Sequence, residues 1–147
     1  MSQFYDGGLH FSCTQCSNCC RHDPGYVFLS SADLHALSDY LGISCNTFES
    51  QYCVSVAMGG GFTLLSLKED AHYDCVFWTE DGCAVYKARP KQCQTYPFWQ
   101  TILEDLESWN REAQQCPGIG TGRLWTSEEI EELLRVRRCI TPIMRRL

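Results

Sequence analysis

The hydrophobic positions between residues 25 and 52 predict an extended segment followed by two short helices. Residues 25–29 are apolar and aromatic, which is typical of a strand or an extended core segment. Ser30 predicts a helix cap, because Leu34, Leu37 and Leu41 follow at helical spacing before Gly42. A second short helix is expected after Ser44, with Phe48 and Tyr52 facing inward.

The middle of the chain predicts strands and a hairpin. Residues 62–67 follow three glycines and are apolar at most positions, which suits a mostly buried strand. Two further apolar segments, 75–78 and 83–86, flank an Asp-Gly pair that favours a tight reversal. We therefore expect a short hairpin that holds the first cysteine of each segment near the other. Pro90 can begin a short helix that carries Cys93.

The last third of the chain predicts further helices. Trp99, Ile102, Leu103 and Leu106 share one helical face, which predicts one helix, or two with a break near Asp105. The glycine-rich residues 117–122 predict a loop. Thr126 and Glu129 form a capping box, so the last helix is expected from about Ser127 to about Ile140. Together these elements predict a small, helix-rich α+β fold with a short β-hairpin.

Length and composition place these elements in one folded domain. The chain has 147 residues, of which 44% are hydrophobic, so we expect a single domain over residues 1–147. No apolar run is long enough to span a bilayer, and residues 1–10 carry no secretory pattern. These features predict a cytoplasmic protein without a membrane partner.

Charge argues against a nucleic-acid partner. The formal net charge is -6, so most of the surface should repel nucleic acid. The last helix begins with glutamates and ends with Arg135, Arg137 and Arg138, an order that complements the helix dipole. Arg145 and Arg146 extend the basic end. We therefore interpret these arginines as a solvated surface, with a nucleic-acid or partner-binding tail as the alternative.

The cysteine content points to metal binding. Eleven cysteines are many for this length, and in a reducing compartment such a density indicates metal ligands. A disulfide-linked secreted domain is the alternative, but C-x-x-C and adjacent cysteines make poor structural disulfides, and one thiol would remain. Cys45, Cys53 and Cys139 fall outside any metal spacing, and we expect them to be core or surface thiols.

Residues 13–20 contain the densest group of cysteines. Cys13, Cys16 and Cys19 repeat the C-x-x-C spacing, which lets two thiolates reach one tetrahedral ion. Cys20 follows directly, and adjacent side chains seldom converge on one point, so it is expected to serve a second ion or to bridge two. The predicted ligands, taken over the whole chain, are Cys13, Cys16, Cys19, Cys20, Cys75, Cys83, Cys93 and Cys116.

Eight thiolates allow more than one centre. They could fill two separate tetrahedral sites, or fewer of them could hold a bridged binuclear centre. Tetrahedral sulfur coordination favours zinc or an iron–sulfur cluster, and we expect two zinc ions, with iron or an iron–sulfur cluster as the alternative. Ligands from distant segments would make metal binding part of folding. Four basic residues near the cysteines could donate hydrogen bonds to sulfur: Arg21, Lys87, Arg89 and Lys91.

The residues favour a metal-binding role over catalysis. No catalytic constellation is recognisable, because His10, His22, His35 and His72 are scattered along the chain. We therefore expect a structural, storage or delivery role for the metal, with a protein partner possible. A metalloenzyme, or an accessory protein in protein modification, stays open and would need an open coordination position or a redox-active metal.

Several motifs recur in a known order. They are the cysteine run 13–21, the segment 25–29, residues 75–77, 82–86, 88–93, 95–99 and 116–120. This order resembles the CxxCxxCC cysteine-cluster family, a zinc- or iron-chelating domain, and the resemblance implies that the eight cysteines above are its ligands. Gln94 and Ser17 depart from the arginine and glycine common in that family. A similar cluster occurs in flagellin lysine N-methylase-type proteins, which implies a link to protein modification.

Overall fold

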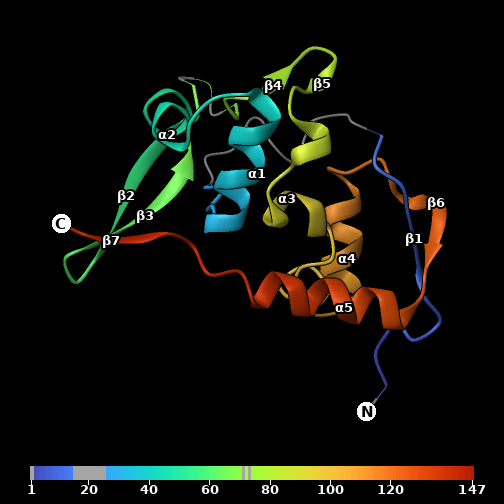
Figure 1. Ribbon diagram of the computed structural model, residues 1–147. Coiled ribbons are helices and arrows are strands. Elements are labelled where there is room, and N and C mark those ends of the chain that lie inside the picture. The colour runs from blue at the N-terminus through green and yellow to red at the C-terminus, as the bar shows by residue number, and fades with distance from the viewer. Residues whose placement is uncertain (1, 15–25, 71, 73) are drawn as a thin grey trace. The chain divides into compact units, whose positions relative to one another are not determined.

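The computed structural model describes residues 2–14, 26–70, 72 and 74–147. The chain forms two compact units, each with helices and strands (Figure 1). Unit 1 comprises Met1–Cys19 and Thr95–Cys139, and unit 2 comprises Cys20–Gln94 and Ile140–Leu147. The mixture of helices and strands confirms the predicted α+β class. One domain over residues 1–147 stays a prediction.

Unit 2 contains the first predicted helix. Helix α1 (Ser31–Leu41) starts at a capping box in which the side chains of Ser30 and Asp33 each accept the other's backbone N–H. It ends at Gly42, which is in the left-handed conformation. Leu37 is fully buried on its inner face. Local capping and apolar spacing therefore confirm this helix.

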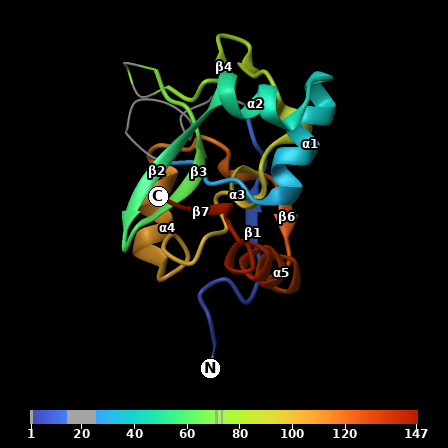
Figure 2. The same cartoon turned by 60° about the vertical axis from the view of Figure 1, so that its left-hand side comes forward.

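The second predicted helix follows at once. Helix α2 (Cys45–Tyr52) is capped by Ser44, whose side chain accepts the backbone N–H of Thr47. Phe48 is fully buried, and its ring lies beside the ring of Tyr52 with centroids 5.2 Å apart. Figure 2 shows α1 and α2 as neighbours within unit 2, as their contacts require.

A three-stranded antiparallel sheet packs in the same unit. Its order is β2 (Cys53–Gly59), β3 (Phe62–Leu67) and β7 (Met144–Arg146). The sequence predicts β3, whose residues are mostly buried, but it misses β2 and β7, whose side chains are mostly exposed. The predicted extended segment is also confirmed over 26–29, because Leu29 donates to the Leu65 carbonyl and is fully buried.

The two arginines near the end of the chain contact other residues of unit 2. Arg145, in β7, donates two hydrogen bonds to the Glu49 carboxylate of α2. The hydrogen bond from Arg145 lowers the pKa of Glu49. Arg146 lies near the ring of Phe62, with 5.7 Å between the guanidinium carbon and the ring centroid. These two arginines therefore lie in a strand with partners, and the prediction about nucleic acid stays untested.

The remaining elements of unit 2 contain the candidate ligands Cys83 and Cys93, and Cys75 precedes them. The hairpin of β4 (Trp78–Thr79) and β5 (Gly82–Cys83) is where the Asp-Gly pair predicts it, with shorter strands than expected. A short 3-10 turn, η2 (Tyr86–Ala88), follows. Helix α3 (Lys91–Thr95) then begins directly after Pro90, as predicted.

Unit 1 contains a two-stranded sheet that the sequence does not predict. Strand β1 (Leu9–Phe11) pairs antiparallel with β6 (Ile119–Trp125), more than a hundred residues away. The loop predicted over residues 117–122 is therefore wrong from residue 119 onward. Glycine allows the strand here, because Gly122 has φ 76° and a Cβ on it would lie 2.0 Å from the Ser12 Oγ.

Two helices complete unit 1. Helix α5 (Ser127–Arg138) begins at the capping box that Thr126 and Glu129 form, as predicted, and ends slightly earlier than expected. Helix α4 (Leu106–Ala113) begins only after Asp105, whose side chain accepts the Ser108 N–H. The helix expected from Trp99 is therefore wrong over 99–104, where turns replace it, and Leu106 is 53% exposed.

Aromatic rings form the core of unit 1. Phe98 is buried and lies between three other rings. Its centroid is 5.8 Å from that of Trp109, 5.3 Å from that of Trp125 and 5.9 Å from that of Phe11. This cluster joins segments from β1, α4 and β6, so apolar burial holds the sheet and the helices of the unit together. Within the described ranges, every helix is too short or too polar to cross a membrane.

Candidate metal centre

The predicted ligands fall into three groups. Cys16, Cys19 and Cys20, together with Arg21 and His22, lie outside the described residues. Unit 1 contains Cys13 and Cys116, and unit 2 contains Cys75, Cys83 and Cys93. In the part of the chain that the structure describes, no disulfide joins two cysteines, and no three His, Cys, Asp or Glu side chains form a metal-holding group. The organisation of the fold around a metal centre therefore stays a prediction.

In unit 1, the backbone next to Cys13 lies very close to the backbone next to Cys116. The Ser12 N–H donates to the Gly118 carbonyl at 3.3 Å, beyond the Phe11–Ile119 pair of the β1–β6 ladder. A Cβ at Gly118 would lie only 2.1 Å from the Ser12 carbonyl oxygen, so only glycine fits. The approach of these two backbones brings the segments that carry both cysteines side by side.

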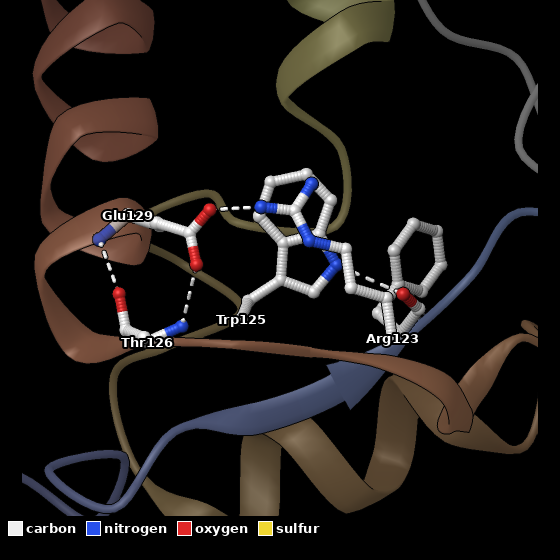
Figure 3. Close-up of polar contacts among 5 residues, drawn as sticks. Arg123, Trp125, Thr126 and Glu129 are labelled. Carbon is white, nitrogen blue, oxygen red and sulfur yellow. Dashed lines mark hydrogen bonds and ion pairs between the residues drawn. The ribbon is translucent and has the colours of Figure 1, made fainter.

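Two hydrogen bonds that involve side chains also join the end of β1 to β6. Ser12 Oγ accepts the Arg123 N–H at 2.9 Å, and the Trp125 indole N–H donates to the Phe11 carbonyl at 2.8 Å. Figure 3 shows the Arg123 guanidinium over the Trp125 ring, with 3.8 Å between its carbon and the ring centroid. These hydrogen bonds therefore fix the position of the backbone as far as Ser12, the residue before Cys13.

The start of α5 anchors this network. The Glu129 carboxylate accepts the Thr126 N–H at 3.0 Å and also pairs with Arg123 (Figure 3). The Thr126 N–H, and then the positive charge of Arg123, lower the pKa of the Glu129 carboxyl. Because the carboxylate stays ionised, it can serve both donors at once. The capping box thus orients Arg123, which in turn covers Trp125.

Cys116 is placed by the end of α4. It is buried, and its N–H donates to the Glu112 carbonyl at 3.0 Å. Its own carbonyl accepts the Ile119 N–H at 3.1 Å, which closes the turn that leads into β6. A thiol in such a position is shielded from bulk water, as suits a closed structural metal site.

In unit 2, Cys75 precedes the β4–β5 hairpin and Cys83 is the last residue of β5. Cys83 pairs with Trp78 across the hairpin, and the Trp78 N–H donates to the Cys75 carbonyl at 2.9 Å. Both cysteines are partly buried against the unit's apolar core. The backbone of Trp78 therefore contacts both cysteines. That the two thiols lie near each other stays a prediction.

A polar turn supports Cys75 from the other side. One oxygen of the Asp70 carboxylate accepts the N–H of His72 at 2.7 Å and that of Asp74 at 3.1 Å. Cys75 also forms a β-bridge with Glu69. The carboxylate thus stabilises the turn whose last residues lead into Cys75.

Helix α3 is held against two earlier segments of unit 2. The Gln92 side chain accepts the Phe28 N–H at 3.2 Å and donates to the Tyr26 carbonyl at 2.8 Å. The Lys91 N–H donates to the buried Asp33 carboxylate at 3.1 Å, while the other oxygen of that carboxylate accepts the Ser30 N–H. These bonds fix Cys93 relative to the segment that follows the dense cysteine run in sequence.

One of the predicted basic donors, Arg89, contacts a neighbouring tyrosine. The Arg89 Nε–H donates to the Tyr86 carbonyl at 3.0 Å, and its guanidinium lies over the ring of the same residue. Lys87, Arg89 and Lys91 line a shallow cavity of about 550 Å³ against α1. Donation from these groups to sulfur stays a prediction.

Sequence reasoning missed the residues that position the cysteines. The spacing after Ser30 predicts the cap of α1, but it does not predict that the Asp33 carboxylate also accepts a hydrogen bond from the first residue of α3. Ser12 and Gly118 carry no signal of their contact, because it depends on the unpredicted pairing of β1 with β6. Gln92 lies in residues 88–93, one of the segments that carry the family resemblance, and this is the sequence signal for its role beside Cys93.

A family model described as "CxxCxxCC: Putative zinc- or iron-chelating domain" matches residues 12–117. The match begins next to Cys13 and ends next to Cys116, so it spans all eight predicted ligands. It also contains Asp33 and Gln92, which hold α3 in place. No solved structure matches the chain.

We predict that Gly118→Ala destabilises the protein by at least about 1–3 kcal/mol, because the added Cβ would displace the Ser12 backbone. Denaturant unfolding measures this change. Gly7→Ala is the matched control, since a Cβ there meets no atom within 4 Å. Equal stabilities of the two variants would contradict the close approach of Ser12 to Gly118.

We also predict that Asp33→Asn lowers the free energy of unfolding by about 1–3 kcal/mol, because an amide cannot accept from both backbone N–H groups in this orientation. Asp39→Asn on the same helix is the control, because Asp39 is exposed and its carboxylate holds no such pair of donors. The same unfolding measurement decides, and an equal loss in both variants would reject the structural role of Asp33.

Proposed function

The chain belongs to the CxxCxxCC family, and on that premise we propose that it binds zinc or iron through its cysteines, with eight of them as ligands. The observation that carries this proposal is the C-x-x-C-x-x-C-C run at residues 13–20, which lies inside the family match. Thiolates at this spacing are typical ligands of tetrahedral zinc and of iron–sulfur clusters. The family description supports metal binding in general terms.

The donor set fits such ions chemically. Cys116 is buried, and Cys75, Cys83 and Cys93 are partly buried, so their thiolates would be shielded from water on binding. Soft sulfur donors select zinc, copper or iron over calcium and magnesium. Backbone hydrogen bonds fix the neighbours of these cysteines, which reduces the conformational entropy that metal binding must overcome.

Zinc, with two ions per chain, is the proposed metal. Eight thiolates provide four ligands for each of two tetrahedral ions. Cys19 and Cys20 are adjacent, so their side chains seldom converge on one ion, and Cys20 would bind the second ion or bridge the two. Iron, alone or in an iron–sulfur cluster, is the alternative that the family description leaves open.

The proposed role of the metal is structural, with storage or delivery as related roles. Structural zinc contributes on the order of 10 kcal/mol to folding, which is comparable to the net stability of a whole domain. Among the residues that the structure describes, each unit has an apolar core of about ten buried residues or fewer, so metal bonds would add substantially to each unit's own stability.

We predict that Cys19→Ala and Cys93→Ala each lower the metal content of the purified protein and its thermal stability. Loss of one ligand opens a tetrahedral site and removes part of its folding energy. Elemental analysis and thermal unfolding measure the two effects. Cys139→Ala is the control, because this exposed thiol at the end of α5 is outside the proposed ligand set. Unchanged metal content and stability in both ligand variants would reject the assignments.

We predict about two zinc ions per chain and no visible colour in protein isolated without oxygen. Elemental analysis and the absorption spectrum are the measurements. A brown protein that contains iron and sulfide would instead establish the iron–sulfur alternative. Slow removal of zinc by a chelator, together with unfolding, would support the structural role over delivery.

A further inference from the structure

A thiol and an imidazole meet in unit 2, away from the proposed ligands. Cys45 Sγ lies 3.6 Å from His35 Nδ1, within hydrogen-bond reach for sulfur. The two residues come from different helices, and neither is within two positions of a proposed ligand. A histidine at this distance can take the proton of a thiol, which is the arrangement that activates cysteine nucleophiles.

The turn between the helices fixes this pair. The Gly42 N–H donates to the Asp39 carbonyl at 3.1 Å, and the Ile43 N–H donates to the Ser38 carbonyl at 3.0 Å. Ser44 then caps α2, so Cys45 is the first residue of that helix. The two side chains are therefore presented to each other by capped helices rather than by a loose loop.

Cys45 also lies at the start of a helix and within reach of solvent. The first turn of a helix has unpaired backbone N–H groups and the positive end of the helix dipole. Cys45 is half-buried and His35 is exposed, so a small reagent can reach the pair from solvent. Accessibility and a proton acceptor thus occur together at one sulfur.

The other two thiols outside the proposed ligand set lack this combination. Burial, with a contribution from the Glu49 charge, raises the pKa of Cys53 to about 12. Cys139 is exposed, and its neighbour Arg135 is a guanidinium, which cannot accept a proton. Comparison of the three thiols singles out Cys45.

We propose that Cys45 is a reversible modification site that exchanges with a low-molecular-weight disulfide, with His35 as its base. His35 Nδ1 accepts the proton of the thiol, and the thiolate attacks one sulfur of the disulfide. A new sulfur–sulfur bond forms as the old one breaks, and the departing thiolate takes the proton from the imidazolium. The Cys45 sulfur is oxidised to a mixed disulfide, and one sulfur of the reagent is reduced to a thiol.

The test follows the reaction at individual cysteines of the intact protein with its metal in place. Oxidised glutathione is the probe, and acid-quenched samples are digested and mapped by mass spectrometry. In the unsubstituted protein, Cys45 should form the mixed disulfide faster than the more exposed Cys139, and Cys53 should stay unmodified. Dithiothreitol should release the adduct.

His35→Gln removes the base at an exposed position. The rate at Cys45 should fall about tenfold or more, with the rate at Cys139 unchanged, because a general base typically contributes 10²–10⁴-fold and Cys45 retains its helix position. Ala36→Gln is the matched control, since it introduces the same side chain at the next exposed position of α1. This control should leave the Cys45 rate unchanged.

Two results would overturn the proposal. One is a Cys45 rate in His35→Gln within twofold of the rate in Ala36→Gln. The other is a Cys45 rate in the unsubstituted protein at or below that of Cys139, which decides the matter even if a variant misfolds. Modification of Cys53 reports misfolding in the same experiment, because that thiol is buried in the folded unit.

Discussion

The contact of Ser12 with Gly118 is the constraint on which unit 1 depends. No side chain can stand at residue 118 while the Ser12 carbonyl oxygen lies where it does. This approach allows the β1–β6 ladder to run on toward Cys13 on one strand and Cys116 on the other. The aromatic core around Phe98 covers the same ladder, so packing and backbone hydrogen bonds fix one position together. Two thiols far apart in sequence are therefore placed by their neighbours.

Unit 2 uses the same principle with different groups. Cys93 is on a helix of only five residues, which would not be stable alone. The Asp33 carboxylate and the Gln92 amide supply the missing stabilisation by bonding to backbone groups of distant segments. Because Asp33 also completes the capping box of α1, one buried carboxylate orients both helices. Cysteine placement again depends on polar contacts that neighbouring residues make.

The parts of the fold that could be predicted are those with local signals. The boxes at Ser30 and Thr126 are satisfied within three residues, so sequence spacing is enough to place α1 and α5. Strands β1 and β7 are three residues long and depend on partners about 110 and 80 residues away, which no local pattern reveals. Ile102 and Leu103 have helical spacing in the sequence, but they lie in turns whose N–H groups donate to the Trp99 carbonyl. The helix α4 begins only after them, because Asp105 is its N-cap. The candidate ligands followed from cysteine spacing, whereas Ser12, Gly118 and the second role of Asp33 required tertiary structure.

Environment, rather than spacing alone, distinguishes the thiols of this chain. A protein with eleven cysteines must keep some sulfur atoms from competing for the same ions or oxidants. Burial keeps Cys53 protonated, since its pKa of about 12 lies far above neutral pH. Cys45 is far in sequence from any C-x-x-C pair and is outside the proposed ligand set. Unlike the buried Cys53, it lies beside an imidazole, that of His35. The same element can thus serve as a metal ligand, an inert core atom or a nucleophile, and the groups within about 4 Å of each sulfur decide which chemistry it supports.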